Sequence, residues 1–217
     1  MLAGELSILL GHVEVFCRHA IDGQLRSWNS DQPVKNGQKY EENWLEAPAG
    51  PLYLILNGST RAGTKRSTYE IAKRKAEIAS KERGIDHPRA GVTPSHDDVL
   101  SWLTMGFWKT LLPDPAYRST MPSPRDKYRL ESARRFIWEH SLSKAFPHLK
   151  NEYVIRYYLN RARFLRNRIA HQESLLRIDV HSHFRTSVRL VRSIDPRLGD
   201  WVAGTSSVVP ILKQKPS

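Results

Sequence analysis

The residues best suited to chemistry stand together in the stretch Asn151–Glu173, where Arg166 and Asn167 are followed by His171. A histidine titrates near neutral pH, so it can take a proton from a ribose 2′-hydroxyl or return one to a 5′-oxygen leaving group. An arginine offers a planar, permanently charged group that matches a phosphate whose charge grows in the transition state. Asn167 precedes His171 by one helical turn and can orient the imidazole or the phosphate. These residue types favour cleavage of RNA, a reaction for which they need no metal ion.

The same stretch predicts a long amphipathic helix. Its apolar residues recur every three or four positions, which is the spacing of a stripe that faces a protein core. They are Ile155, Tyr158, Leu159, Ala162, Leu165 and Ile169. A polar stripe lies beside it on the helix and contains Arg156, Asn160, Arg163, Asn167 and His171.

Arg166 is the exception, because its angular position falls inside the apolar stripe. Since an unpaired guanidinium is costly to bury, we expect it to face a crevice or a subunit interface. Residues five apart on an ideal helix point roughly 140° away from each other, so Arg166 and His171 diverge. Either the helix bends near its end, or two copies of the chain meet across a two-fold axis and build a composite cleft.

Four stretches in order along the chain resemble one protein family. The run Leu165–Glu173 is similar to the R-x4-6-H motif of HEPN ribonucleases, in the form carried by the abortive-infection-like (Abi-like) bacterial proteins. Val13–Ala20 resembles the first-helix pattern of that family, Met105–Leu112 its Phe-Gly-Phe-Trp segment, and Lys144–Leu149 the stretch before the catalytic helix. Two positions depart from the pattern. His19 stands where Asn is usual, and Met105 where Phe is usual.

This resemblance implies an all-α fold, a HEPN-type helical bundle, and a metal-independent endoribonuclease that acts as a toxin or in phage defence. It implies a homodimer in which two Arg166/His171 pairs share one positively charged cleft, and products with 2′,3′-cyclic phosphate and 5′-hydroxyl ends. His171 would be the general acid or base, Arg166 the phosphate clamp and Asn167 the orienting group. An antitoxin protein is a further partner that such an enzyme implies.

Two other functions remain as alternatives. A non-catalytic HEPN module would hold RNA or a partner protein in the same basic cleft without cutting it. A DNA-binding regulator has less support, because the chain shows no short helix-turn-helix pair with a polar recognition helix. Retention of both Arg166 and His171 favours the enzyme.

The composition of the chain limits which of these functions are plausible. With 217 residues, of which 40% are hydrophobic, the chain can bury one sizeable core, and a single domain spanning residues 1–217 is expected. A net charge of +12 favours a polyanionic partner, with nucleic acid ahead of membrane. No apolar run approaches the roughly 20 residues that span a bilayer, and the N-terminus lacks the pattern of a signal peptide. The single cysteine, Cys17, is expected to be a buried small hydrophobe in a protein of the reducing cytoplasm.

Periodicity and capping residues predict five further helices. The segment at about 29–98 is expected to be a partly irregular insertion, because turn-forming clusters interrupt it. Within it, Leu52–Leu56 is ambiguous between a short strand and a helical turn. In the helix from about 123 to 144, Tyr128, Phe136, Ile137 and Leu142 are expected to anchor the core. The five helices are expected at about 6–28, 67–83, 94–112, 123–144 and 179–193.

Basic side chains near the motif and on the 67–83 helix are candidate contacts for an RNA backbone. Glu14 and Arg18 stand four apart, so a solvated ion pair is one interpretation. The alternatives are that Arg18 contacts substrate near His171, or that Glu14 tethers an active-site arginine. The candidates for RNA binding are Arg18, Arg163, Arg168, Lys73 and Arg74.

No cofactor or metal is expected. His181 and His183 lack the further ligands that a structural zinc needs. Gly58–Lys65 has displaced phosphate-loop spacing, and a basic turn is the expected reading. Trp102 and Trp108 are expected to pack in the core rather than to stack on bases.

Overall fold

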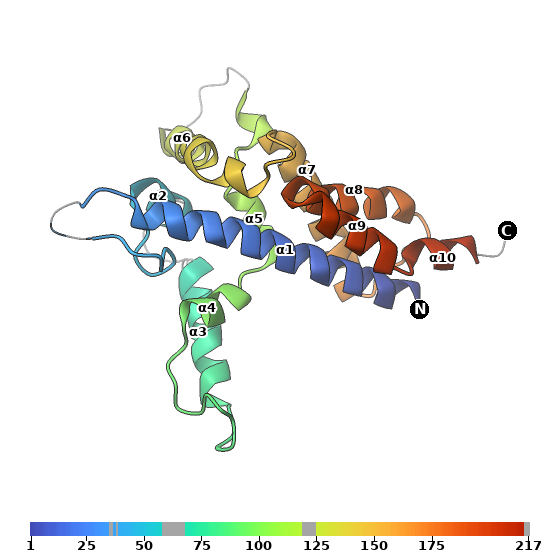
Figure 1. The fold of residues 1–217 in the computed structure, drawn as a ribbon, viewed down its shortest axis with the longest axis horizontal. Coiled ribbons are helices and arrows are strands. Elements are labelled where there is room, and N and C mark those ends of the chain that lie inside the picture. The colour runs from blue at the N-terminus through green and yellow to red at the C-terminus, as the bar shows by residue number, and fades with distance from the viewer. Residues whose placement is uncertain (35–36, 38, 58–67, 119–124, 215–217) are drawn as a thin grey trace.

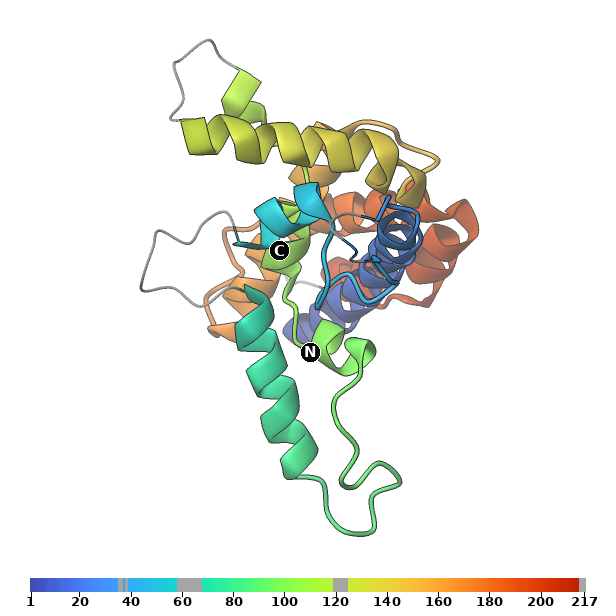
Figure 2. The ribbon, with the colours of Figure 1, turned by 90° about the vertical axis from the view of Figure 1, so that its left-hand side faces the viewer.

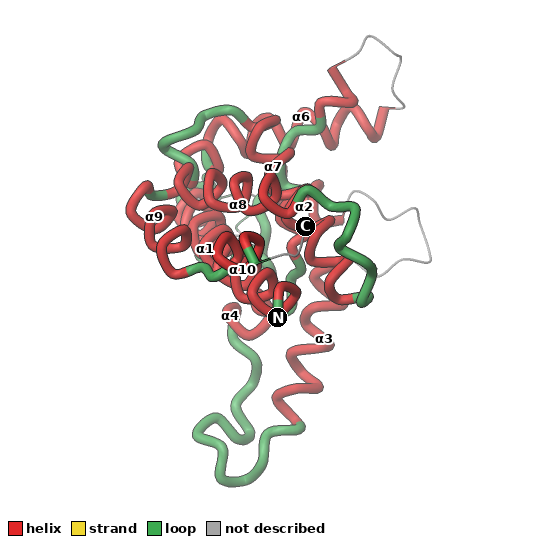
Figure 3. The backbone as a smooth tube through the Cα atoms, turned by 90° about the vertical axis from the view of Figure 1, so that its right-hand side faces the viewer, coloured by secondary structure: helices red, strands yellow, loops and turns green. Residues whose placement is uncertain are grey.

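The computed structural model describes residues 1–34, 37, 39–57, 68–118 and 125–214. These residues form an all-α structure without strands, as the sequence predicts (Figure 3). The fold is a helical bundle joined to a partly irregular segment. No helix in the described ranges is long and apolar enough to cross a membrane.

The longest helix, α1 (Leu2–Ser30), runs along the body of the bundle (Figure 1). Its core-facing side chains repeat at helical spacing, which is why the stretch folds as one amphipathic helix. Cys17 lies among them and is fully buried, and burial raises the pKa of its thiol. The buried apolar residues of α1 are Leu6, Leu9, Leu10, Val13, Cys17, Ile21, Leu25 and Trp28.

The motif helix, α7 (Glu152–Ala170), packs on α1 and on α8 (Val180–Ile194). The predicted apolar stripe of α7 is confirmed, since Ile155, Leu159, Ala162 and Leu165 are buried. The predicted helix at 179–193 is also confirmed, with Asp179 as its N-cap. Two short helices, α9 (Pro196–Thr205) and α10 (Val208–Lys213), complete this side.

The segment after α1 is held to it by one buried amide. The Asn29 side chain donates to the carbonyls of Glu41 and Ala47, at 2.7 and 3.0 Å, and accepts from the Ala49 N–H at 2.8 Å. The ambiguous run Leu52–Leu56 is helical and lies in α2 (Gly50–Asn57), which packs against α6 (Arg125–His140). The Gly58–Lys65 run and the Ser123–Pro124 helix start lie outside the described residues.

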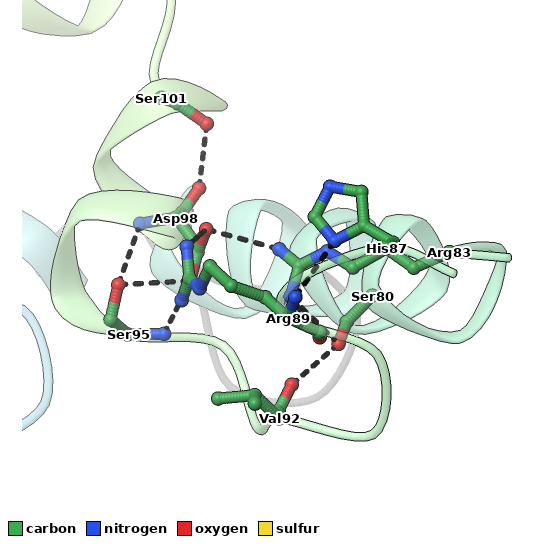
Figure 4. A network of polar contacts seen from close by, with 8 residues as sticks. All are labelled: Ser80, Arg83, His87, Arg89, Val92, Ser95, Asp98 and Ser101. Carbon is green, nitrogen blue, oxygen red and sulfur yellow. Dashed lines mark hydrogen bonds and ion pairs between the residues drawn. The ribbon is translucent and has the colours of Figure 1, made fainter. Parts of the chain in front are cut away.

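An arm extends from the body. It consists of α3 (Thr68–Lys81) and the segment that returns to α4 (His96–Ser101), as Figures 1 and 2 show. Ser95 caps α4 in a reciprocal capping box with Asp98. Asp98 also binds Arg89, at 2.8 and 2.5 Å, and Arg83, at 3.2 Å, so one carboxylate ties the end of α3 to the start of α4 (Figure 4).

The expectation of one helix from about 94 to 112 is wrong. The chain forms α4 and then α5 (Met105–Thr110), with a break at Trp102–Thr104. Apolar residues stand on every side of this stretch, so a continuous helix could not bury them all, whereas the break turns Leu103 and Met105 into the core. Trp102 stays at the surface with Lys75 5.6 Å from its ring centroid, contrary to the core packing expected for it. Trp108 is buried as expected.

The helix predicted at about 123–144 ends earlier than expected. α6 ends at His140 and is followed by the 3-10 turn η2 (Leu142–Ala145). Ile137 and Leu142 anchor the core as expected, but Tyr128 and Phe136 are exposed. Phe136 stacks on His140 at a centroid separation of 4.1 Å, so a neighbouring ring covers one of its faces instead of the core.

Candidate active site

The helix that carries the motif has a defined start and a defined end. Asn151 caps its N-terminus, accepting from the N–H groups of Tyr153 and Val154 at 3.1 Å. At the other end His171 is the C-cap, and its N–H still donates to the Asn167 carbonyl at 2.9 Å. The helix α7 is continuous to Ala170, so Arg166 and Asn167 both lie within it and His171 follows directly as its cap.

Two further backbone hydrogen bonds close the end of α7. The Gln172 N–H donates to the Ile169 carbonyl at 3.0 Å, and the Glu173 N–H donates to the Arg168 carbonyl at 2.8 Å. This pair of bonds is the Schellman arrangement, which places the residue after the cap in the left-handed region. Gln172 has φ of 55°, where glycine is usual. The closure holds the exposed His171 at the tip of the helix.

Glu14 of α1 connects two arginines. Its Oε2 lies 3.6 Å from Arg166 Nε on α7, and its Oε1 accepts from Arg18 Nη2 at 3.3 Å. An ion pair with Arg18 is one interpretation of the sequence, although the pair is part-buried rather than solvated. A Glu14 that tethers an active-site arginine is another, and the contact with Arg166 agrees with it. Both contacts are present. The two guanidinium groups and the one carboxylate together carry a net positive charge.

Arg166 lies at an open hollow of about 330 Å³ between α1 and α7. Its side chain is 46% exposed although its helical position falls within the apolar stripe. The sequence-based expectation of a crevice is therefore confirmed. The hollow is lined by Ser7, Leu10, Gly11, Glu14, Arg166, Ile169 and Ala170.

The three predicted catalytic residues are all exposed to solvent at the end of α7. Arg166 points toward the hollow, whereas Asn167 and His171 continue the polar stripe. On an ideal helix Arg166 and His171 still diverge by roughly 140°. Within one chain, the helix therefore presents the arginine and the histidine on different faces.

The five predicted RNA contacts are dispersed. Arg18 lies beside Glu14, and Arg163 is half-buried on α7. Arg168 is occupied by the turn that follows the helix, since it donates to the Ser174 carbonyl at 2.8 Å and pairs with Glu173 at 3.1 Å. Lys73 and Arg74 belong to the arm and do not line the hollow at Arg166.

On the arm, Lys73 lines a separate cavity of about 730 Å³, together with Glu46 and Glu77. Its ammonium group lies 5.8 Å from the centroid of the Tyr69 ring. Arg74 is fully at the surface. Lys73 therefore faces carboxylates and an aromatic ring as well as solvent, while Arg74 faces solvent.

No known protein family, characterised protein or solved structure matches the chain. The resemblance to Abi-like HEPN proteins therefore stays a prediction that depends on the motifs.

A second polar cluster, absent from the sequence predictions, joins α1 to α4. Asp22 accepts from Trp44 Nε1 at 2.8 Å, from Arg26 Nε at 2.6 Å, and lies 2.9 Å from His96 Nε2. Burial alone would raise the pKa of Asp22, but the hydrogen bonds from His96, Arg26 and Trp44 outweigh it and hold that pKa below its ordinary value. No local pattern records this cluster, because its members come together only through the fold.

Asp22, His96 and Asp97 are the one group in the described ranges that could supply three ligands to a metal ion, with ligand atoms within 4.8 Å of one another. Arg26 already binds both carboxylates. A cation would therefore have to displace a guanidinium group. His183, one of the histidines weighed for zinc, is buried against Phe164 with a centroid separation of 5.9 Å, and burial lowers its pKa.

Proposed function

We propose that this protein is a metal-independent endoribonuclease of the HEPN type. The observation that carries the proposal is the arrangement at the end of α7, where Arg166 is held by Glu14 at an open hollow and His171 is exposed one and a half turns further on. Arg166 at the hollow and an exposed His171 on another face of the helix are residues of the types that cleavage by the ribose 2′-hydroxyl needs.

In the proposed reaction His171 accepts the proton of the 2′-hydroxyl, and the 2′-oxygen attacks the adjacent phosphorus. The bond from phosphorus to the 5′-oxygen breaks, and a protonated histidine gives that oxygen its proton. The products are a 2′,3′-cyclic phosphate and a 5′-hydroxyl end. Arg166 neutralises the charge that grows on the phosphate oxygens, and Asn167 orients the substrate or the imidazole.

The proposed active form is a homodimer. Because α7 is continuous to Ala170, and residues five apart on a helix diverge, we expect a second copy to be needed to bring an arginine and a histidine to one phosphate. The surface of α1 beside the hollow supports this arrangement. Ile8 and Val15 are 56% and 55% exposed there, and Gly4 and Gly11 have open space around them, so a second helix can approach closely.

The resemblance also suggests the biological role, which we propose to be that of a cytoplasmic toxin or phage-defence effector restrained by an antitoxin protein. The net charge of +12 supports RNA as the substrate. The rival function is a non-catalytic module that binds RNA or a partner. A binding module would use the positive charge in the same way, but it assigns no role to the exposed His171.

The first test is cleavage of total cellular RNA by purified protein in excess EDTA. Arg166→Ala and His171→Ala are compared with wild type, and Arg185→Ala, an exposed arginine on α8, is the matched control. Circular dichroism checks that all four proteins fold. We expect wild type and the control to cut in chelator and leave cyclic phosphate ends, and the two site variants to be inactive.

Two results would overturn the proposal. If neither the wild type nor any variant cuts RNA, but all of them bind it equally well, a non-catalytic binding module is the better interpretation. If all four cut equally, the activity belongs to another site. Growth arrest on expression, abolished by His171→Ala, would test the proposed role as a toxin.

A further inference from the structure

One arginine of α7 has no partner. Five arginines lie on this helix, and Arg156, Arg161, Arg166 and Arg168 each bind a group elsewhere in the fold. Arg163 makes no hydrogen bond or ion pair with any described residue. Its Nε is sealed from solvent and unpaired. Arg161 and Arg168 of the same helix also have a buried, unpaired Nε, so what distinguishes Arg163 is that none of its guanidinium nitrogens has a described partner.

Lys109, in the last turn of α5, is the second cation at this place. It donates to the Asn160 Oδ1 at 3.3 Å, which is a neutral acceptor, and has no ion pair with a described carboxylate. Burial and the charges of Arg156 and Arg163 lower the pKa of Lys109. Asp114 opposes that effect, but Arg156 already pairs with it. Lys109 and Arg163 are therefore left without an ion-pair partner among the described carboxylates.

Arg163 lies beside Gly106 of α5. A Cβ built on Gly106 would lie 3.4 Å from Arg163 Cδ, at van der Waals contact, so the arginine stem runs next to the backbone of α5. This contact places the arginine against the same short helix that carries Lys109. The two cations come from helices that pack on each other, and Asn160 bridges toward Lys109.

This cationic site leads to the motif along one face of α7. At 100° per residue, Asn160, Arg163 and Asn167 fall within about 60° of one another, and His171 lies about 40° beyond Asn167. The eight residues from Arg163 to His171 rise about 12 Å along the helix. The sequence has no acidic residue between Glu152 and Glu173, so α7 itself contributes no carboxylate that would repel a phosphate along this face.

We propose that Lys109, Asn160 and Arg163 form a subsite for a backbone phosphate of single-stranded RNA, from which the strand runs along α7 past Asn167 to His171. This inference rests on the proposed function for its direction toward His171. A single strand is the fitting ligand because the path is one helix wide, and because 2′-hydroxyl attack needs a nucleotide free of the regular duplex.

Binding can be tested without cleavage. The probe is a fluorescent 2′-O-methyl oligouridylate, which has no free 2′-hydroxyl to attack, and its affinity is measured over a series of salt concentrations. Lys109→Gln and Arg163→Gln shorten the side chains and remove the charge but keep a polar group. Each is expected to weaken binding about tenfold. Each should also reduce the slope of log affinity against log salt by about 0.7, the value for one phosphate contact on a single strand.

Three further variants control the measurement. Arg185→Gln removes an exposed charge of α8 and should change neither affinity nor slope. Lys109→Arg and Arg163→Lys restore the charge, so they should recover most of the affinity and most of the salt dependence. A purely structural role for the side chains would not predict this recovery. Thermal melts show whether each variant folds.

The outcomes separate this proposal from the nuclease. If wild type cuts RNA but the two Gln variants bind with unchanged affinity and slope, the subsite is wrong and the nuclease stands. If wild type does not cut but the charge at both positions controls binding, the nuclease is wrong and the subsite stands. Equal loss in the Gln and the charge-restoring variants would also overturn the subsite.

Discussion

Glu14 Oε2 lies 3.6 Å from Arg166 Nε, and this ion pair joins α1 to the last turns of α7 at the open hollow. The same carboxylate accepts a hydrogen bond from Arg18. One acid thus restrains two guanidinium groups without cancelling their combined charge. A phosphate that enters the hollow would meet Arg166, whose orientation is already limited by Glu14, which lowers the cost of ordering this side chain on binding.

Glu14→Gln tests this restraint. The amide keeps the shape of the side chain but loses the ion pairs, so Arg166 should be free to leave its position. We expect kcat for RNA cleavage to fall between about tenfold and a hundredfold, because a small misplacement of a catalytic group has that effect. RNA affinity should be unchanged or higher, since a negative charge is removed. Glu5→Gln on the same helix is the control, and an equal loss in both variants would contradict the role of Glu14.

Ile8→Glu tests the homodimer. A charge in the middle of the exposed apolar face of α1 should prevent a second copy from packing there. We expect light scattering to report a dimer for wild type and a monomer for the variant, with loss of cleavage in the variant. Ile85→Glu is the matched control, because Ile85 is 92% exposed on the arm. A wild-type protein that is a strict monomer with full activity would contradict the composite site.

The elements predicted correctly are those with a strong amphipathic pattern. In α7 and α8 one face is apolar and the other is charged, so spacing alone identifies both the helix and its buried side. The same reasoning placed Arg166 at a crevice, because a guanidinium in an apolar stripe needs an opening to solvent. Its contact with Glu14 is one of the interpretations of the sequence, and only the packing of α1 on α7 shows that this contact and the ion pair with Arg18 are both present.

The failures have physical reasons. The stretch from Val99 to Leu112 is apolar on all sides, so it has no periodicity that could reveal the break at Trp102–Thr104. The pairing of Asp22 with His96 joins residues that only the fold brings together. The same is true of Lys109 and Asn160, whose contact depends on how α5 crosses α7.

Asp98→Asn tests how the arm is held. Hydrogen bonds from Arg89, followed by those from Ser95, hold the pKa of Asp98 below its ordinary value although its partial burial acts in the opposite direction. A lowered pKa in the folded state means that the carboxylate stabilises the arm above its ordinary pKa, near pH 4, and loses this effect as pH falls toward the folded value.

In wild type, hydrogen exchange of the amides in residues 82–95 should therefore accelerate as the pH falls from about 5 to 3, after correction for the intrinsic rate. In Asp98→Asn, exchange should be faster at neutral pH and should lack that acid-dependent step. Asp86→Asn, an exposed acid in the same segment, is the control. An acid-dependent step of equal size in Asp98→Asn would show that another group controls the arm.

Gln172→Gly tests whether the end of α7 carries backbone strain. A side chain at φ of 55° is disfavoured by about 1–2 kcal/mol, whereas glycine adopts this conformation freely but loses more entropy on folding. We expect a net gain in the free energy of unfolding of about 0.5–1 kcal/mol, with cleavage unchanged because both backbone hydrogen bonds of the Schellman arrangement remain.

Gly91→Ala is a control in which the change runs in the opposite direction, from glycine to a residue with a side chain. Gly91 has φ of 71° and nothing within 4 Å of an added Cβ, so alanine there should destabilise through the backbone alone. If Gln172→Gly melts below wild type while Gly91→Ala behaves as expected, the glutamine side chain makes a contribution at the tip of α7 that outweighs its strain.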